Sequence, residues 1–292
     1  MILRHTFRAM GTDVEFLLEA GPREDGLGAL RAAAGEVSRL ERILSRFRPD
    51  SELSQLNRSG RMRVGSDLLA LVVQALEQRD RTAGRFDPTV HDAVVAAGYD
   101  RSIESLPAEV QGRAPVPGGG DVAVDVEECL VSLASGVRLD LGGIAKGFTA
   151  DRVADALAGC GPCLVSLGGD IAVRGPRTSG PWTVGLATGN GPLTLALDSG
   201  AIATSGRDRR RWRCNGREAH HIIDPVTGAP SETDLLRVSV VASTGVEAEA
   251  HAKALMLAGR AEAAREADAR GIPAVLVGVG GETTLTGGLH DA

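Results

Sequence analysis

The chain alternates between short apolar segments that end at glycine-rich turns and longer segments in which apolar residues recur with helical spacing. The first twenty residues resemble two strands broken at Met10 and Gly11, and further strand-like segments cluster between residues 163 and 205. The helical segments are 27–47, 66–84 with Ser66 as its N-cap, 145–159, 246–258 and the stretch that follows up to 270. Two short strand-like segments, 122–126 and 130–135, are expected to form a hairpin. Because hairpins and helices are mixed without a regular alternation, we expect an α+β fold with mixed sheets.

The length and net charge of the chain limit its domain organisation and the partners it can bind. At 292 residues it can form one large domain or two closely packed ones, and we expect a single domain over 1–292. A net charge of −6 leaves no basic excess to neutralise phosphates, so we expect no nucleic-acid partner. The one basic cluster, "RDRRRWR" at 207–213, is either a solvated loop or a single anion contact.

The N-terminal residues carry charges throughout and lack the apolar core of a secretory signal. We therefore expect a cytoplasmic protein without membrane insertion. The "CGPC" sequence at 160–163 resembles a thioredoxin motif, but a helix-like segment precedes it and a strand-like segment follows. Because the redox motif needs the opposite order, we interpret "CGPC" as a turn.

The segment "LDLGGIAKG" holds Lys146, one of two lysines in an arginine-rich chain. It is predicted to end a strand and to open a helix, with Gly142 and Gly143 in the turn. A helix N-terminus with a nearby cation is suited to a phosphate group. The alternative is a plain strand–turn–helix with a surface lysine.

Two other turns carry polar side chains. In "SLGGDIAVRG" Asp170 follows a glycine pair, which alone is typical of a hairpin turn. In "HHIIDPVTGAP" two histidines precede a turn that Pro225 and Gly228 favour. His220 and His221 point in opposite directions if this segment is a strand, so at most one of them faces a given site.

The ordered set of motifs is more specific than any one of them. "MGTDVEF", "SRFRPDSELSQLN", "GRFDPTV", "LDLGGIAKGFTADRV", "SLGGDI", "IATSGRDRRRW", "HHIIDPVTG" and "VVASTGVEAEAHAKALMLAG" follow one another in the order found in the ApbE family. The sequence resembles the FAD:protein FMN transferases over nearly the whole chain. The resemblance implies two packed lobes with a nucleotide cleft between them. It also implies the activity: the FAD pyrophosphate is cleaved, FMN is esterified to a Thr or Ser of a target protein, and AMP leaves.

The resemblance also assigns roles to individual residues. It implies that His221 is a general base toward the acceptor hydroxyl, a role suited to the pKa of histidine, although a structural bond holding the DPVTG turn is the alternative. The residues that match segments lining the flavin nucleotide are Met10, Asp87, Gly143, Ala145, Lys146, Gly169, Asp170, Ser205 and Gly206.

The metal site of the family is altered in this chain. In the family Mg²⁺ is held by an Asp and a Thr four residues apart and by a main-chain oxygen near the AKG segment, which corresponds here to Ala145. Glu249 stands where the Asp is usual, and Lys253 stands where the Thr is usual. Glu249 keeps a hard oxygen ligand, but an ammonium cannot bind a cation. Either Glu249 and Lys253 form an exposed salt bridge between neighbouring turns, or Lys253 replaces the metal and screens the pyrophosphate.

Three functions therefore follow from the sequence. The first is a transferase acting on FAD and a target protein with an acceptor Thr or Ser, with altered metal dependence. The second is an FAD pyrophosphatase in which water replaces the hydroxyl and yields FMN and AMP. The third is a flavin-nucleotide-binding protein without catalytic activity. The sequence contains nothing that determines the target protein or the oligomeric state.

Overall fold

The computed structural model describes residues 1–21, 25–189 and 191–289. The chain divides into two compact units. The first unit comprises Met1–Glu41, Ile144–Ser205 and Asp234–Ala292, and the second comprises Arg42–Gly143 and Gly206–Thr233. Both units combine helices with strands, so the α+β prediction is confirmed.

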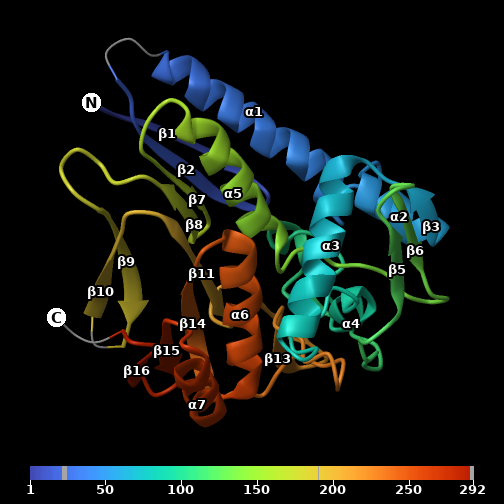
Figure 1. Ribbon diagram of the computed structural model, residues 1–292. Helices are drawn as coiled ribbons and strands as arrows, with labels where there is room; N and C mark the ends of the chain where they lie inside the picture. The colour runs from blue at the N-terminus through green and yellow to red at the C-terminus, as the bar shows by residue number, and fades with distance from the viewer. Residues whose placement is uncertain (22–24, 190, 290–292) are drawn as a thin grey trace. The chain divides into compact units, whose positions relative to one another are not determined.

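An eight-stranded sheet forms the centre of the first unit (Figure 1). Its strand order is β1-β2-β7-β8-β11-β14-β15-β16, so strands distant in sequence become neighbours. The pairs β1–β2, β2–β7, β7–β8 and β8–β11 are antiparallel. The strands are β1 (Ile2–Ala9), β2 (Thr12–Glu19), β7 (Cys163–Leu167), β8 (Asp170–Arg174), β11 (Gly200–Gly206), β14 (Leu235–Ala242), β15 (Ala274–Gly278) and β16 (Thr283–Thr286).

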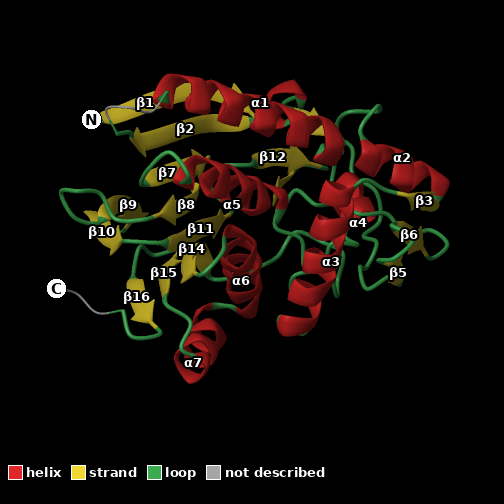
Figure 2. Cartoon of the chain, turned by 45° about the horizontal axis from the view of Figure 1, so that its top comes forward, coloured by secondary structure: helices red, strands yellow, loops and turns green. Residues whose placement is uncertain are grey.

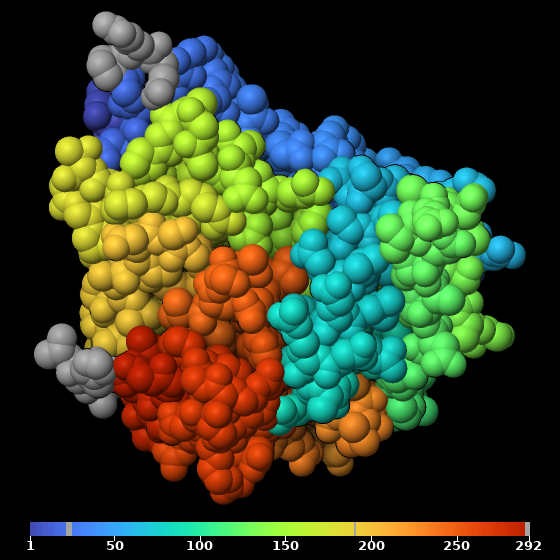
Figure 3. Space-filling model, in the orientation of Figure 1, coloured from blue at the N-terminus to red at the C-terminus, as the bar shows by residue number. Residues whose placement is uncertain are grey.

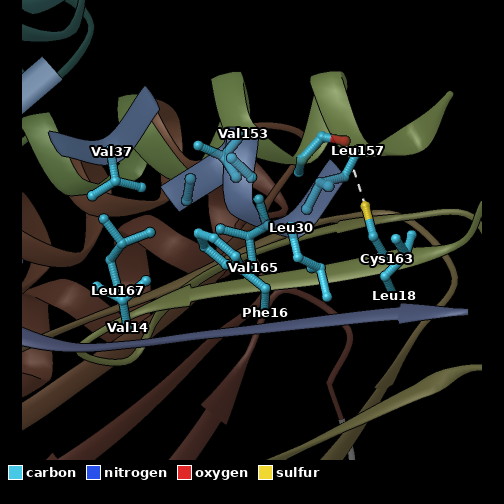
Figure 4. Close-up of a cluster of buried hydrophobic side chains, with 14 residues drawn as sticks. Val14, Phe16, Leu18, Leu30, Val37, Val153, Leu157, Cys163, Val165 and Leu167 are labelled. Carbon is cyan, nitrogen blue, oxygen red and sulfur yellow. Dashed lines mark hydrogen bonds between the residues drawn. The ribbon is translucent and has the colours of Figure 1, made fainter. Parts of the chain in front are cut away.

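Two helices bury their apolar sides against one face of this sheet. Figure 4 shows α1 (Gly26–Leu44) and α5 (Ala145–Ala158) above the strands, with Leu30 and Val153 directed toward Phe16 and Val165. Alternate residues of a strand face opposite sides of a sheet, which is why Val165 joins this cluster whereas Leu164 joins the cluster on the other face. The remaining helices of this unit are α6 (Gly245–Ala258) and α7 (Arg260–Arg270).

A two-stranded hairpin packs on the opposite face of the sheet (Figure 2). Its strands β9 (Trp182–Thr188) and β10 (Gly191–Leu197) pair antiparallel. Trp182, Val184 and Leu186 alternate with exposed residues, so a single side of the hairpin is apolar. This side contacts Val173 and Ile202, and the hairpin thereby completes the second core layer.

The second unit contains two small sheets and three α-helices. Its sheets have the strand orders β13-β12-β4 and β3-β6-β5. The hairpin predicted after residue 121 is confirmed as β5 and β6. The elements are α2 (Glu52–Ser59), β3 (Arg61–Arg63), α3 (Ser66–Arg81), α4 (His91–Ala96), the 3₁₀-helix η1 (Ile103–Ser105), β4 (Glu109–Val110), β5 (Val122–Asp125), β6 (Leu130–Leu133), β12 (Arg211–Cys214) and β13 (Arg217–His220).

Two local predictions are wrong. The segment 137–143 is not a strand, because the side-chain amide of Asn57 occupies the backbone N–H and C=O of Leu139. Ser66 is the first residue of α3 and not its cap; the capping position belongs to Gly65, which provides no side-chain bond. In both places the backbone has the expected conformation, but its hydrogen-bond partners differ from the expected ones.

The turn interpretation of "CGPC" is confirmed. The motif connects the end of α5 to the start of β7, and the Cys163 thiol is buried and donates to the carbonyl of Ala154. Burial raises the pKa of Cys163 to about 11, which keeps the thiol protonated and unreactive. Within the described ranges, the structure has no helix with the length and apolarity required to cross a membrane.

Candidate functional site

The N-terminal ends of α5 and α6 meet at two glycines, and the space-filling view shows the two helices side by side (Figure 3). A Cβ on Gly245 would lie 2.6 Å from the carbonyl oxygen of Gly147 and 2.8 Å from its Cα. Real Cβ atoms do not approach other atoms this closely, so the crossing requires glycine. The glycine of the "AKG" sequence, Gly147, thus permits the backbones of the two helices to lie in direct contact.

The first backbone N–H groups of α6 are hydrogen-bonded by the side chains of Thr244 and Asp151. The Thr244 hydroxyl accepts from the N–H of Glu247, and one carboxylate oxygen of Asp151 accepts from the N–H groups of Gly245 and Val246 at 2.8 and 3.3 Å. Burial raises the pKa of Asp151, although these hydrogen bonds oppose the shift. Asp151 therefore joins α5 to α6 by charge as well as by packing.

Three charged side chains from three separate elements converge beside this crossing. The ammonium of Lys146 on α5 forms ion pairs with Asp170 at the start of β8 and with Glu249 on α6. The Nζ–Oε1 distance to Glu249 is 3.2 Å. The Asp170 and Glu249 side chains are 2% and 7% exposed, and that of Lys146 is 15% exposed. We call Lys146, Asp170 and Glu249 the ion cluster.

The remaining carboxylate oxygens of the ion cluster bind backbone amides. Oε2 of Glu249 accepts from the N–H of Gly147 at 2.9 Å, and Oδ1 of Asp170 accepts from the N–H of Thr204 at 3.2 Å. The Thr204 hydroxyl in turn lies 2.8 Å from that of Ser239 on β14. Buried carboxylates are tolerated because cations and N–H donors surround them. Both oxygens of Glu249 therefore bind groups of α5, the Lys146 ammonium and the Gly147 amide.

The residues that the family resemblance assigns to Mg²⁺ do not fit a metal ion here. Mg²⁺ requires oxygen donors in near-octahedral geometry. The Ala145 carbonyl accepts from the buried Thr149 hydroxyl at 2.7 Å, and both Glu249 oxygens have partners in α5. The third position is the ammonium of Lys253, which has no lone pair to donate. Throughout the part of the chain that the structure describes, no three His, Cys, Asp or Glu side chains are grouped to hold a metal.

Asp87 supports a loop in the second unit. One oxygen of its buried carboxylate accepts from the N–H and hydroxyl of Thr89, and the other accepts from the N–H of Gly119 at 2.8 Å. Nε of Arg79 lies 3.6 Å from Oδ2 of Asp87, so the guanidinium offsets the charge of the carboxylate. The glycine-rich loop at 118–120 is therefore positioned by Asp87 and Thr89, which the "FDPT" sequence brings together.

Both ring nitrogens of His220, the first histidine of "HHIIDPVTG", are hydrogen-bonded. Nδ1 of His220 accepts from the N–H of Ile222, and Nε2 donates to the carbonyl of Ser231 at 3.1 Å. This arrangement requires the neutral Nε2–H tautomer, and burial lowers the pKa of His220 accordingly. The turn itself is closed by the Asp224 carboxylate, which accepts from the N–H of Val226. His220 therefore bonds backbone groups on both sides of the DPVTG turn, and both alternatives for His221 stay predictions.

Sequence reasoning missed a cluster of planar groups in the second unit. The Arg46 guanidinium lies 4.1 Å from the Phe47 ring centroid and 4.7 Å from that of Tyr99, and it pairs with Asp140 at 3.0 Å. Tyr99 stacks on Trp212 at 5.1 Å. The chain has one tyrosine and two tryptophans. This scarcity of large aromatic residues was the signal in the sequence that could have directed attention to the cluster.

The structure thus brings together Lys146, Asp170 and Glu249, with Ala145 adjacent in sequence to the lysine. Gly169 lies in the β7–β8 turn with a φ of 100°, and Ser205 is buried next to Thr204 on β11. For the other residues predicted from the sequence, the structure shows the local backbone or the unit to which they belong. Met10 has a φ of 51° and donates its N–H to Glu41, while Gly143, Gly206 and His221 belong to the second unit.

A comparison with known families now places the chain. The sequence model of the ApbE family matches residues 10–276. The chain belongs to the ApbE family. Among solved structures, the ApbE protein of Thermotoga maritima shares 26% identity with a TM-score of 0.87, covering 98% of this chain and 97% of that one. The ApbE-like fold expected from the sequence is therefore confirmed.

Two relatives named FAD:protein FMN transferase match over most of their length. The FAD:protein FMN transferase of Treponema pallidum is 33% identical over 267 residues, which is 79% of this chain and 72% of that protein. The FAD:protein FMN transferase of Vibrio cholerae is 29% identical over 281 residues, covering 87% of this chain and 82% of that protein. A solved variant of the Vibrio cholerae flavin transferase ApbE gives a TM-score of 0.84 at 25% identity, over 98% of this chain and 97% of that one.

Proposed function

We propose that this ApbE-family chain is an FAD:protein FMN transferase. The observation that carries the proposal is the 33% identity to a transferase of that name over 79% of the chain. In the reaction, a Thr or Ser hydroxyl oxygen of the target protein forms a bond to the FMN phosphorus of FAD. The pyrophosphate P–O bond breaks, AMP leaves with the bridging oxygen, and the hydroxyl proton passes to a base.

The ion cluster supplies the cation for this reaction. Negative charge builds on the phosphate oxygens and on the leaving AMP, and a fixed ammonium stabilises it most effectively where water is excluded. Lys146 stands at the second residue of α5, and its neighbours Asp170 and Glu249 hold its charge in place. Gly147 and Gly245 add to this role by keeping the two helix ends together.

We assign the base to His221. The supporting argument is that an imidazole accepts a proton near neutral pH, and that the described bonds across the DPVTG segment are made by the neighbouring His220. The other proposed nucleotide contacts are those of the sequence motifs: Met10, Asp87, Gly143, Ala145, Gly169, Ser205 and Gly206. Mg²⁺ is not assigned a step, because the donor set described above does not fit it.

The products of FAD distinguish this function from its two alternatives. The protein is incubated with FAD and a soluble extract of its source cells, and the products are followed by mass spectrometry and in-gel flavin fluorescence. AMP with a covalently flavinylated protein is the expected result. AMP with free FMN alone would instead identify a pyrophosphatase, and bound but intact FAD would identify a binding protein.

A charge-matched pair of variants tests the role of Lys146. We expect Lys146→Met to slow AMP release by about 100-fold, the typical loss when one group that stabilises developing charge is removed. Arg265→Met removes a positive charge from the exposed surface of α7 and should leave the rate unchanged. Equal rates for Lys146→Met and the wild type would contradict the assignment.

A further inference from the structure

The charges of the ion cluster bear on whether the reaction requires a divalent metal ion, an inference that rests on the proposed function. Its two buried carboxylates and one ammonium retain a single negative charge. Lys253 lies one turn beyond Glu249 on α6, and residues four apart share a face of a helix. With Lys253 counted, two carboxylates and two ammonium groups have no net charge, so this stretch of α5, β8 and α6 has no surplus negative charge to attract a divalent cation.

The oxygen atoms of this region leave no favourable place for such a cation. To enter, Mg²⁺ would displace Lys146 from Glu249, or take the Glu249 oxygen that now accepts from Gly147. Either exchange would place an ammonium and a divalent cation against the same buried carboxylates, at a strong electrostatic cost. It would also break a hydrogen bond at the α5–α6 crossing, where the backbones of Gly147 and Gly245 are already in close contact.

We propose that this chain binds and cleaves the FAD pyrophosphate without a divalent cation, and that the ammonium groups of Lys146 and Lys253 donate hydrogen bonds to the phosphate oxygens in the place of the metal. The glutamate at 249 suits this arrangement, because one carboxylate reaches both the Lys146 ammonium and the Gly147 amide. Lys146 is anchored from two sides by Asp170 and Glu249. Lys253 is the second cation on the same helix face as Glu249.

The dissociation constant of FAD, measured by quenching of flavin fluorescence, tests the proposal independently of turnover. We expect the constants in EDTA and in excess MgCl₂ to agree within about twofold, and the rates of AMP release to agree likewise. A loss of tenfold or more in EDTA, restored by Mg²⁺, would overturn the inference and leave the proposed function intact. No FAD binding in either medium would overturn both.

Two variants sharpen the test. Lys253→Met keeps the apolar stem and removes the charge, so FAD should bind at least tenfold more weakly, without recovery in Mg²⁺. The double variant Glu249→Asp/Lys253→Thr installs the acidic and hydroxyl ligands usual in the family, and its FAD binding should become dependent on Mg²⁺. Circular dichroism verifies that both variants fold. Unchanged FAD affinity in Lys253→Met would refute the role of this lysine.

Discussion

The glycine crossing of α5 and α6 gives the sharpest prediction on stability. In Gly245→Ala the new Cβ would lie 2.6 Å from the Gly147 carbonyl oxygen, where ordinary contact begins at 3.4 Å. The nearest atoms all belong to the Gly147 backbone, so no flexible side chain can move aside. Overpacking of this kind costs about 1–3 kcal/mol, and a contact between two backbones belongs in the upper half of that range.

Alanine also recovers some helix propensity, at most about 1 kcal/mol. The net expectation is that Gly245→Ala lowers the free energy of unfolding by about 2 kcal/mol, measured by urea denaturation followed by circular dichroism. FAD affinity should fall as well, because moving α6 separates Glu249 from Lys146. Gly159→Ala is the matched control: Gly159 ends α5 in a right-handed conformation, and a Cβ there meets nothing within 4 Å.

The control variant should be neutral or slightly more stable than the wild type. If Gly245→Ala unfolds within about 0.5 kcal/mol of the wild type while Gly159→Ala does the same, the close approach of the helices does not constrain the fold.

Three further predictions concern titration and charge. Because folding lowers the pKa of His220 below 6.5, only the unfolded chain takes up its proton as the pH falls through that value. Stability should therefore decrease below pH 6.5 by up to about 1.4 kcal/mol per pH unit, and His220→Gln should reduce this slope; parallel urea midpoints for both proteins would contradict it. Cys163 should resist iodoacetamide at mildly alkaline pH whereas the partly exposed Cys160 reacts, as peptide mass mapping will show. Arg46→Met should lower the free energy of unfolding by about 3–5 kcal/mol, because the Asp140 carboxylate loses a buried cation; thermal melts that superimpose on the wild type would refute this.

The sequence predicted those parts of the fold that depend on local pattern. Helical periodicity located α5 and α6 to within two residues, and alternation located the strands around the β7–β8 turn. Leu139 shows where this reasoning ends. Its segment looks extended and is extended, but it pairs with the side chain of Asn57 and not with a strand, and no local pattern records that partner.

The candidate site was predicted in its members but not in its connections. Lys146, Asp170 and Glu249 were each singled out from motifs, and the structure brings them into contact. The i, i+4 rule directed attention to Lys253 as the partner of Glu249, whereas the carboxylate binds Lys146 and Gly147 on α5. That contact depends on the glycine crossing, and only the folded backbone reveals how closely two helices approach.

The ion cluster also has a bearing on the order of folding. Its members are contributed by segments separated by up to 103 residues, so it closes only after the sheet has assembled strands from both ends of the chain. Long-range contacts of this kind form late, since chain entropy must be lost before they are made. In a refolding experiment, recovery of nucleotide binding should therefore lag behind recovery of helical signal. A nascent chain that has not yet released α6 from the ribosome has Lys146 and Asp170 but lacks their third partner, and it acquires the site only when synthesis is nearly complete.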